Sequence, residues 1–253
     1  MNNLILALLY REIKILYTQK HYAFLKFLFF LAQLTIFYFL CKMISQEYFQ
    51  FLFYGLVFSK IFANVFTTPI EVVKNEKYWG TIENLFMLPY SEAAVFINIC
   101  IIKYIFLLGE LLLIFLFGQI YGIKFTFITL IYFLIYLVFL IIIYLGVILI
   151  NFAFSLLFKK FEVSSWLVVT LVDLFSGVYF PVETFPYKLQ LISKFLPTTY
   201  LLKFLREFVI ENNFKFDLLI YPIIFGLMLI PISILFFNLS LRKVYLSGEL
   251  SSL

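Results

Sequence analysis

The sequence predicts an all-α integral membrane protein with six transmembrane helices, on the evidence of its composition and the lengths of its apolar runs. Of the 253 residues, 64% are hydrophobic and 13% are charged, whereas soluble domains have roughly 45–50% apolar and about 25% charged residues. A helical span needs roughly 20 apolar residues, and six such runs with short loops consume the chain. We therefore expect residues 1–253 to form a single transmembrane domain, with spans at about 24–44, 48–68, 93–118, 126–157, 164–182 and 217–238.

The segment before the first span, 2–19, is predicted to be an amphipathic helix. Its more polar residues recur at three- or four-residue steps on a helix dominated by Leu and Ile: Asn3, Ala7, Arg11, Lys14 and Thr18. Such a helix can lie along the membrane interface, which is the interpretation we favour. The alternative is a cytoplasmic extension of the first span.

The segment between the second and third spans, 71–91, is predicted to form a short helix on the membrane surface. Gly80 and Thr81 can begin it, with the threonine hydroxyl as a cap, and Pro89 ends it. One face of this helix carries Ile82, Leu85 and Phe86, while Glu83 and Asn84 lie elsewhere. If displayed, these residues suit docking into a groove on another protein. An ordinary surface loop whose apolar face rests on lipid is the alternative.

The segment before the last span, 183–208, is predicted to form two short helices separated by a proline. Gly177 and Pro181 interrupt the fifth apolar run, Pro186 begins an amphipathic stretch, and Pro197 ends it. Both helices are too short to span and too apolar for open solvent. They are typical of a re-entrant hairpin, which is tolerated at membrane depth when packed in protein or lining a cavity. Two helices lying flat on the outer surface are the alternative.

Four ionisable residues fall inside apolar runs: Lys60, Lys103, Glu110 and Asp173. Charge near the bilayer centre costs roughly 2.5–3.5 kcal/mol on insertion scales, so such residues face a cavity or a partner. Glu110 and Asp173 are therefore candidates for a substrate path. Pairing with Lys60 or Lys103, which would fix helix packing, is the interpretation we favour.

Charge placement predicts the orientation of the chain. Its net charge is +5, and a cytoplasmic N-terminus places the larger share of the basic residues near the span ends on the cytoplasmic side. Six spans then put both termini in the cytoplasm. We expect a multi-pass protein of the plasma (inner) membrane, in contact with lipid and not with nucleic acid. The single histidine, His21, and two cysteines in apolar segments leave no metal cluster and no constellation for a membrane hydrolase or acyltransferase.

At two segments the sequence resembles the permease subunit of type-2 ATP-binding-cassette (ABC) exporters. The cytoplasmic segment carries Glu76, Gly80, Thr81, Glu83, Leu85 and Pro89. The outer segment carries Ser176-Gly177-Val178, Phe180-Pro181, Pro186, Leu189-Gln190, Pro197, Tyr200 and Arg206. The N-terminal helix and the six spans match as well, so the resemblance covers essentially the whole chain.

The resemblance implies a function and a set of partners. In that family the cytoplasmic segment is the coupling helix that docks on an ATPase, which assigns that contact to the matching residues here and to Trp79 between them. It also implies a dimer of identical or different permeases, served by two ATPases, that moves a lipid, drug or glycan-type substrate outward. The chain has no G-x-x-x-x-G-K-[ST] loop, so it is not expected to be an enzyme, and ATP and Mg belong to the partner ATPase.

A stand-alone ion-coupled secondary transporter or channel is the alternative function. It would use Glu110 and Asp173 for coupling to an ion. Secondary transporters often contain inverted repeats, and residues 1–125 show no similarity to 126–253. The exporter permease is therefore the interpretation we favour.

Overall fold

A computed structural model describes residues 2–123, 127–158, 161–210 and 215–247. Within these ranges all regular structure is helical, which confirms the predicted all-α class. The elements are α1 Asn2–Thr18, α2 Lys20–Lys42, α3 Gln46–Tyr78, α4 Ile82–Phe86, α5 Glu92–Ile120, α6 Phe127–Leu157, α7 Phe161–Phe175, the 3-10 turn η1 Val182–Thr184, α8 Tyr187–Phe195, α9 Pro197–Ile210 and α10 Asp217–Ser247.

Five of the described helices are long and apolar enough to cross a membrane: α2, α3, α5, α6 and α10. The remaining predicted span corresponds to α7, whose apolar part is the shorter stretch Ser164–Phe175. The predicted start of the fourth span at Thr126 lies outside the described residues, as does the side chain of Asn3 from the predicted N-terminal stripe.

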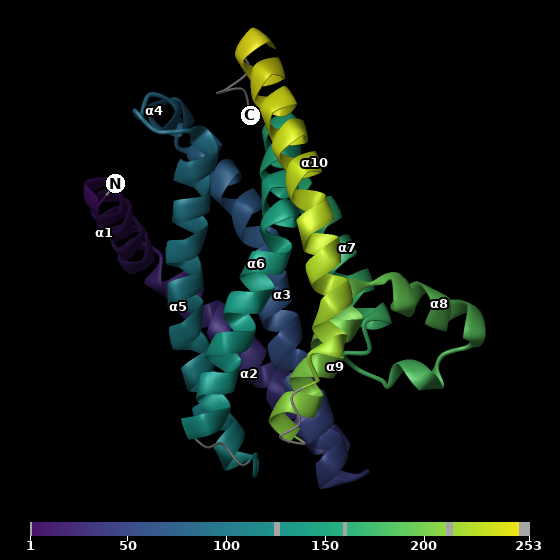
Figure 1. Ribbon diagram of the computed structural model, residues 1–253. Helices are drawn as coiled ribbons and strands as arrows, with labels where there is room; N and C mark the ends of the chain where they lie inside the picture. Colours follow the sequence, from purple (N-terminus) through teal and green to yellow (C-terminus); the bar gives the residue numbers. More distant parts are fainter. Residues whose placement is uncertain (1, 124–126, 159–160, 211–214, 248–253) are drawn as a thin grey trace.

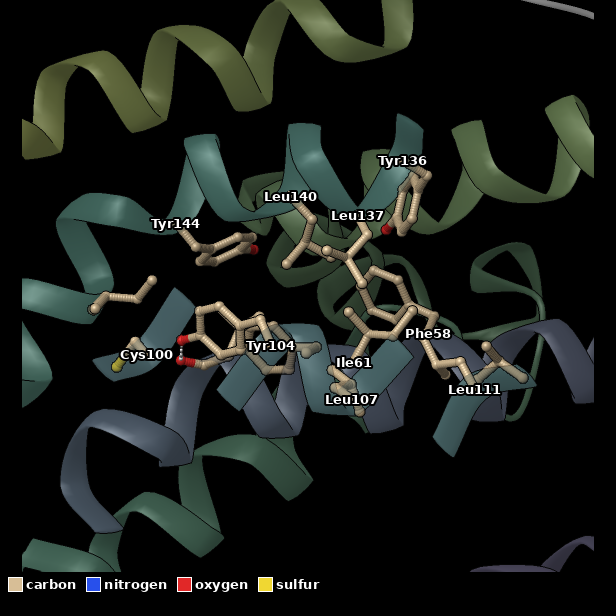
Figure 2. Packing of buried hydrophobic residues seen from close by; sticks show 14 of the residues in the cluster. Phe58, Ile61, Cys100, Tyr104, Leu107, Leu111, Tyr136, Leu137, Leu140 and Tyr144 are labelled. Atoms are coloured by element: carbon tan, nitrogen blue, oxygen red, sulfur yellow. Dashed lines mark hydrogen bonds between the residues drawn. The ribbon is translucent and has the colours of Figure 1, made fainter. Parts of the chain in front are cut away.

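The helices form an elongated bundle in which α6 and α10 run side by side, while α3 packs against α2, α5, α6 and α7 (Figure 1). One end of the bundle, here called the α4 end, holds α1, α4 and the last turns of α10. The α2–α3 junction lies at the opposite end, and α8 projects from the side of the bundle. The core is aliphatic and aromatic, with Phe58 and Ile61 of α3 facing Tyr136 and Leu140 of α6 (Figure 2).

Three helix ends differ from those expected: those of α3 and α7, and that of α10, which continues to Ser247 although its apolar run was expected to end near residue 238. The apolar run of the second span ends near residue 68, but α3 continues unbroken to Tyr78, because charged residues end an apolar run without ending a helix. The fifth run was expected to reach residue 182, but α7 ends at Phe175. Gly177 takes the left-handed backbone conformation (φ +84°), and the Val178 N–H donates to the Asp173 carbonyl at 3.3 Å, which closes the helix.

Candidate functional site

The loop that joins α3 to α4 is a glycine-terminated helix end. Gly80 has φ +67°, a conformation that glycine adopts without the Cβ penalty of other residues. The Gly80 N–H donates to the Lys77 carbonyl at 3.1 Å and the Thr81 N–H to the Glu76 carbonyl at 2.9 Å, the bond pattern of a Schellman motif. Gly80 therefore ends α3, whereas it was expected to begin the following helix, α4.

The Glu76 carboxylate connects three elements at this end. Its Oε1 accepts from Arg11 Nη2 of α1 at 2.5 Å, and its Oε2 accepts from the Thr81 hydroxyl at 2.6 Å. That hydroxyl, expected to cap α4, donates to Glu76 instead. The network continues through Glu12, which lies 3.0 Å from Arg11 Nη2 and 3.7 Å from Lys103 Nζ of α5. Both carboxylates are about 2% exposed, so they are compensated charges that fix α1, α3, α5 and the start of α4 relative to one another.

A second basic residue anchors α3 to the neighbouring span at the same end. Lys77 Nζ donates to the Ser155 carbonyl at 3.1 Å and the Leu156 carbonyl at 2.9 Å. These carbonyls belong to the last turn of α6, where backbone acceptors have no helical donor and a cation is favourable. The end of α3 is therefore held from two sides.

The apolar face of α4 is turned inward. The prediction that Ile82 and Leu85 are displayed for a partner or for lipid is wrong, because they are 0% and 8% exposed and belong to the core. Phe86 packs edge-on against Phe96 of α5. Leu85 thus positions α4 and does not offer a contact surface.

Another set of side chains is exposed around α4, and we call it the α4 surface. Met87 is 79% exposed, Tyr78 72% and Trp79 41%. Glu83 and Asn84 are exposed between them, and Pro89 follows. The surface combines aromatic and thioether groups with one carboxylate on a short helix that is fixed from beneath.

Arg206 of α9 holds the segment that follows α7. Its Nη1 donates to the Gly177 carbonyl at 2.9 Å, and its Nη2 donates to the Val178 carbonyl at 3.1 Å and the Phe51 carbonyl at 3.2 Å. The guanidinium also lies 3.4 Å from the centre of the Phe51 ring. We call this set of contacts the Arg206 clamp, and it joins α9, α3 and the Gly177 turn at the end opposite α4.

Gly55 of α3 makes room for the Arg206 clamp. A Cβ at this position would lie 2.4 Å from the Val178 carbonyl oxygen and 2.8 Å from Arg206 Nη2. The Ser176 and Thr198 hydroxyls, which share a hydrogen bond, close the same junction from α9.

The predicted hairpin consists of two helices with different environments. Pro186 precedes α8, and Pro197 is the first residue of α9, where its missing N–H costs nothing. Four residues of α9 are fully buried inside the bundle: Leu201, Leu202, Phe204 and Leu205. In contrast, Tyr187 and Phe195 of α8 are 72% and 77% exposed. Packing inside protein therefore describes α9, and α8 lies outside the packed core. Pro181 stands just before η1 at the start of this segment.

The two candidate substrate-path carboxylates each have a neighbour in the described structure. Glu110 Oε2 lies 2.9 Å from Lys60 Nζ, and Asp173 Oδ2 accepts from the Ser59 hydroxyl at 2.6 Å. The expected pairing with a lysine is therefore present for Glu110, whereas Asp173 has a serine neighbour in place of a lysine, and its Oδ1 is buried without a hydrogen-bond partner in the described part of the chain. Among the described residues no group of three or more His, Cys, Asp or Glu side chains is placed to hold a metal ion.

Several residues that complete these networks were not predicted from the sequence. Arg11 was predicted only as part of the polar stripe of the N-terminal helix. In the structure it is the cation that the buried Glu76 carboxylate needs, although Glu76 lies far along the chain. Ser59 and Phe51 carry no sequence signal at all, because their partners are set by the packing of distant helices. The partners of Arg206 are backbone carbonyls, which leave no trace in the sequence.

Comparison with known protein families decides the class of the chain. The family model of the ABC-2 type transporter matches residues 3–210, a range that contains α1 except for its first residue, the Glu76 network, α4 and the Arg206 clamp. The chain belongs to the ABC-2 type transporter family. No curated protein matches it.

Membership in the ABC-2 family establishes the general character of the protein. It is an integral, multi-pass membrane protein and the permease component of an ABC transporter, and the family's membrane domain lacks a nucleotide-binding cassette. The family therefore implies an ATPase partner. The sequence resemblance to the type-2 permease subunit is confirmed.

Proposed function

We propose that this permease is the transmembrane subunit of an exporter that moves a lipid, drug or glycan-type substrate outward by alternating access. A separate ATP-binding-cassette subunit binds and hydrolyses ATP with Mg, and its closure is transmitted through the α4 surface. A second permease, identical or different, completes the pathway in the plasma membrane. In this arrangement both termini and the α4 end are cytoplasmic, and the Arg206 clamp faces outward.

The proposal rests on the way in which α4 is attached to the spanning helices. A docking element transmits force only when it is fixed to the spanning helices beneath it. The Glu76 carboxylate ties the start of α4 to α1 and α3, and Ile82 and Leu85 are buried in the core. Motion imposed on α4 is therefore transmitted to α3. A transporter that switches between two arrangements requires this of its coupling element.

The exposed side of α4 supplies the contact. Trp79, Glu83 and Met87 are exposed on one short segment, and aromatic and Met side chains are enriched in the centres of protein interfaces. The residues that the resemblance assigned to coupling thus divide into two roles. Trp79, Glu83 and Pro89 meet the ATPase, while Glu76, Gly80, Thr81 and Leu85 hold the helix in place.

Site-directed photo-crosslinking tests this docking with a matched pair of positions. Met87 and Met43 are both exposed methionines at turns between helices (79% and 88%), but 33-residue α3 separates them. We expect a crosslinker at Met87 to capture a polypeptide that contains a G-x-x-x-x-G-K-[ST] loop, and one at Met43 to capture none. Capture of only lipid or this same chain at Met87, or equal capture of the ATPase at both positions, would contradict the proposal.

A further inference from the structure

Helix α3 contains a proline in its interior, and the carbonyl that this proline leaves free is bound from another helix. Pro69 has no N–H, so the Val65 carbonyl lacks its usual donor four residues on. In a bilayer such a group must be satisfied within the protein. The Tyr104 hydroxyl of α5 donates to this carbonyl at 3.1 Å, and Tyr104 is 3% exposed (Figure 2).

The next carbonyl of α3 is bound from a third helix. Asn151 Nδ2 of α6 donates to the Phe66 carbonyl at 2.8 Å, and Asn151 is 2% exposed. The carbonyl that the proline leaves free and the carbonyl next to it thus each accept a side-chain bond, one from α5 and one from α6. A helix bends most readily at a proline, where a backbone bond is missing, so this is the place where α3 bends at least cost.

The two arms of α3 on either side of Pro69 are fixed to different parts of the molecule. The short arm ends at Glu76 and Lys77, which bind α1, the start of α4 and the end of α6. The long arm carries Phe51, whose carbonyl belongs to the Arg206 clamp. The proline lies nine residues from Tyr78, or about 14 Å at 1.5 Å per residue, and 23 residues from Gln46, or about 35 Å.

We propose that Pro69 is the hinge of α3, and that Tyr104 and Asn151 are positioning residues that hold it in the arrangement described here. Release of these two bonds lets the short arm swing with α4 while the long arm stays with the clamp. The inference rests on the proposed function, since the ATPase supplies the force that bends α3 at Pro69. A bend of about 25° would move the end of the short arm sideways by about 6 Å.

Distance measurements between spin labels at Tyr78 and Leu246 report this swing. Both positions are exposed at the α4 end (72% and 80%), one on the short arm and one on α10, and the two native cysteines are buried and are replaced. In the chain without nucleotide, Tyr104→Phe should populate a second distance between the labels. The ratio of its population to that of the first distance should rise by about threefold, the effect of one interhelical hydrogen bond in a membrane. Asn151→Leu should act in the same direction as an independent variant.

Two further variants separate a hinge from a merely structural bond. Tyr144→Phe removes an equally buried hydroxyl that has no hydrogen-bond partner among the described residues, so it should leave the distances unchanged. Pro69→Ala restores the missing N–H, so it should suppress the effect of Tyr104→Phe and block the shift that ATP with vanadate produces in the complex with the ATPase.

The outcomes distinguish this inference from the proposed function. Unchanged distances in Tyr104→Phe and Asn151→Leu, an equal effect of Tyr144→Phe, or a failure of Pro69→Ala to suppress would each overturn the hinge. These comparisons need no nucleotide. A missing response to ATP with vanadate in the unsubstituted complex would instead count against the proposed function.

Discussion

Replacement of Glu76 by glutamine should destabilise the protein by about 1.5–3 kcal/mol, the range for a hydrogen bond to a charged group. The substitution keeps the size of the side chain and removes the charge that accepts from Arg11 at 2.5 Å. Breaking a fully buried ion pair costs about 3–5 kcal/mol. The lower range applies here because the Arg11 side chain is 29% exposed and keeps Glu12 at 3.0 Å.

Glu71→Gln is the matched control on the same helix. Glu71 pairs with Lys26 at 3.1 Å, but the two side chains are 38% and 49% exposed, so the expected loss is about 0–1 kcal/mol. Equilibrium unfolding in mixed detergent micelles measures both free energies of unfolding. Equal losses for the two variants would refute the assignment of Glu76 as the residue that holds α1 and α4 in place.

Three further predictions follow from other contacts. Gly80→Ala should lower the free energy of unfolding by about 1–2 kcal/mol, because the φ of Gly80 is +67°. Gly109→Ala, inside α5, should raise it by about 0.5–1 kcal/mol, because no heavy atom outside the local helix backbone lies within 4 Å of the new Cβ. The same unfolding assay checks the opposite signs. Arg206→Lys keeps the charge but not the fork that reaches three carbonyls, so it should lower the free energy of unfolding by about 2–3 kcal/mol, and a loss below about 0.5 kcal/mol would show that the clamp is not needed. Glu110→Gln removes the anion that pairs with Lys60, whose side chain is only 10% exposed. The double variant with Lys60→Met should therefore be more stable than Glu110→Gln alone. Simple additivity of the effects of the two substitutions would contradict the pairing.

Elements that depend on local sequence were predictable. The apolar runs give the long helices directly, and Pro186 and Pro197 mark the breaks on either side of α8. Glycine at positions 80 and 177 marks two helix ends, although Gly80 was expected to begin α4 and the fifth span was expected to continue beyond Gly177 to residue 182. These features follow from neighbours in the chain, so periodicity and proline or glycine chemistry suffice.

Features that depend on distant packing were not predictable. Whether Ile82 and Leu85 face a partner or the core is decided by α3 and α5, against which α4 packs, and the sequence of the short helix does not specify this packing. Burial of Glu76 requires Arg11, which is 65 residues away, and the pair of Asp173 and Ser59 joins helices 114 residues apart. A list of charged residues names the candidates, but only the arrangement of helices selects the pairs.

The most direct test of the central claim is whether ATP bound to a separate subunit moves the outer end of this permease. Spin labels at Ile44, in the α2–α3 junction at that end, and at Phe195, on the projecting helix α8, are both exposed (69% and 77%), and the distance between them is measured in lipid nanodiscs. With the ATPase bound, ATP and vanadate should shift the distance distribution, and the chain alone should not respond to nucleotide. An unchanged distribution in the complex, or the same shift without the ATPase, would contradict the claim that a separate motor drives this protein.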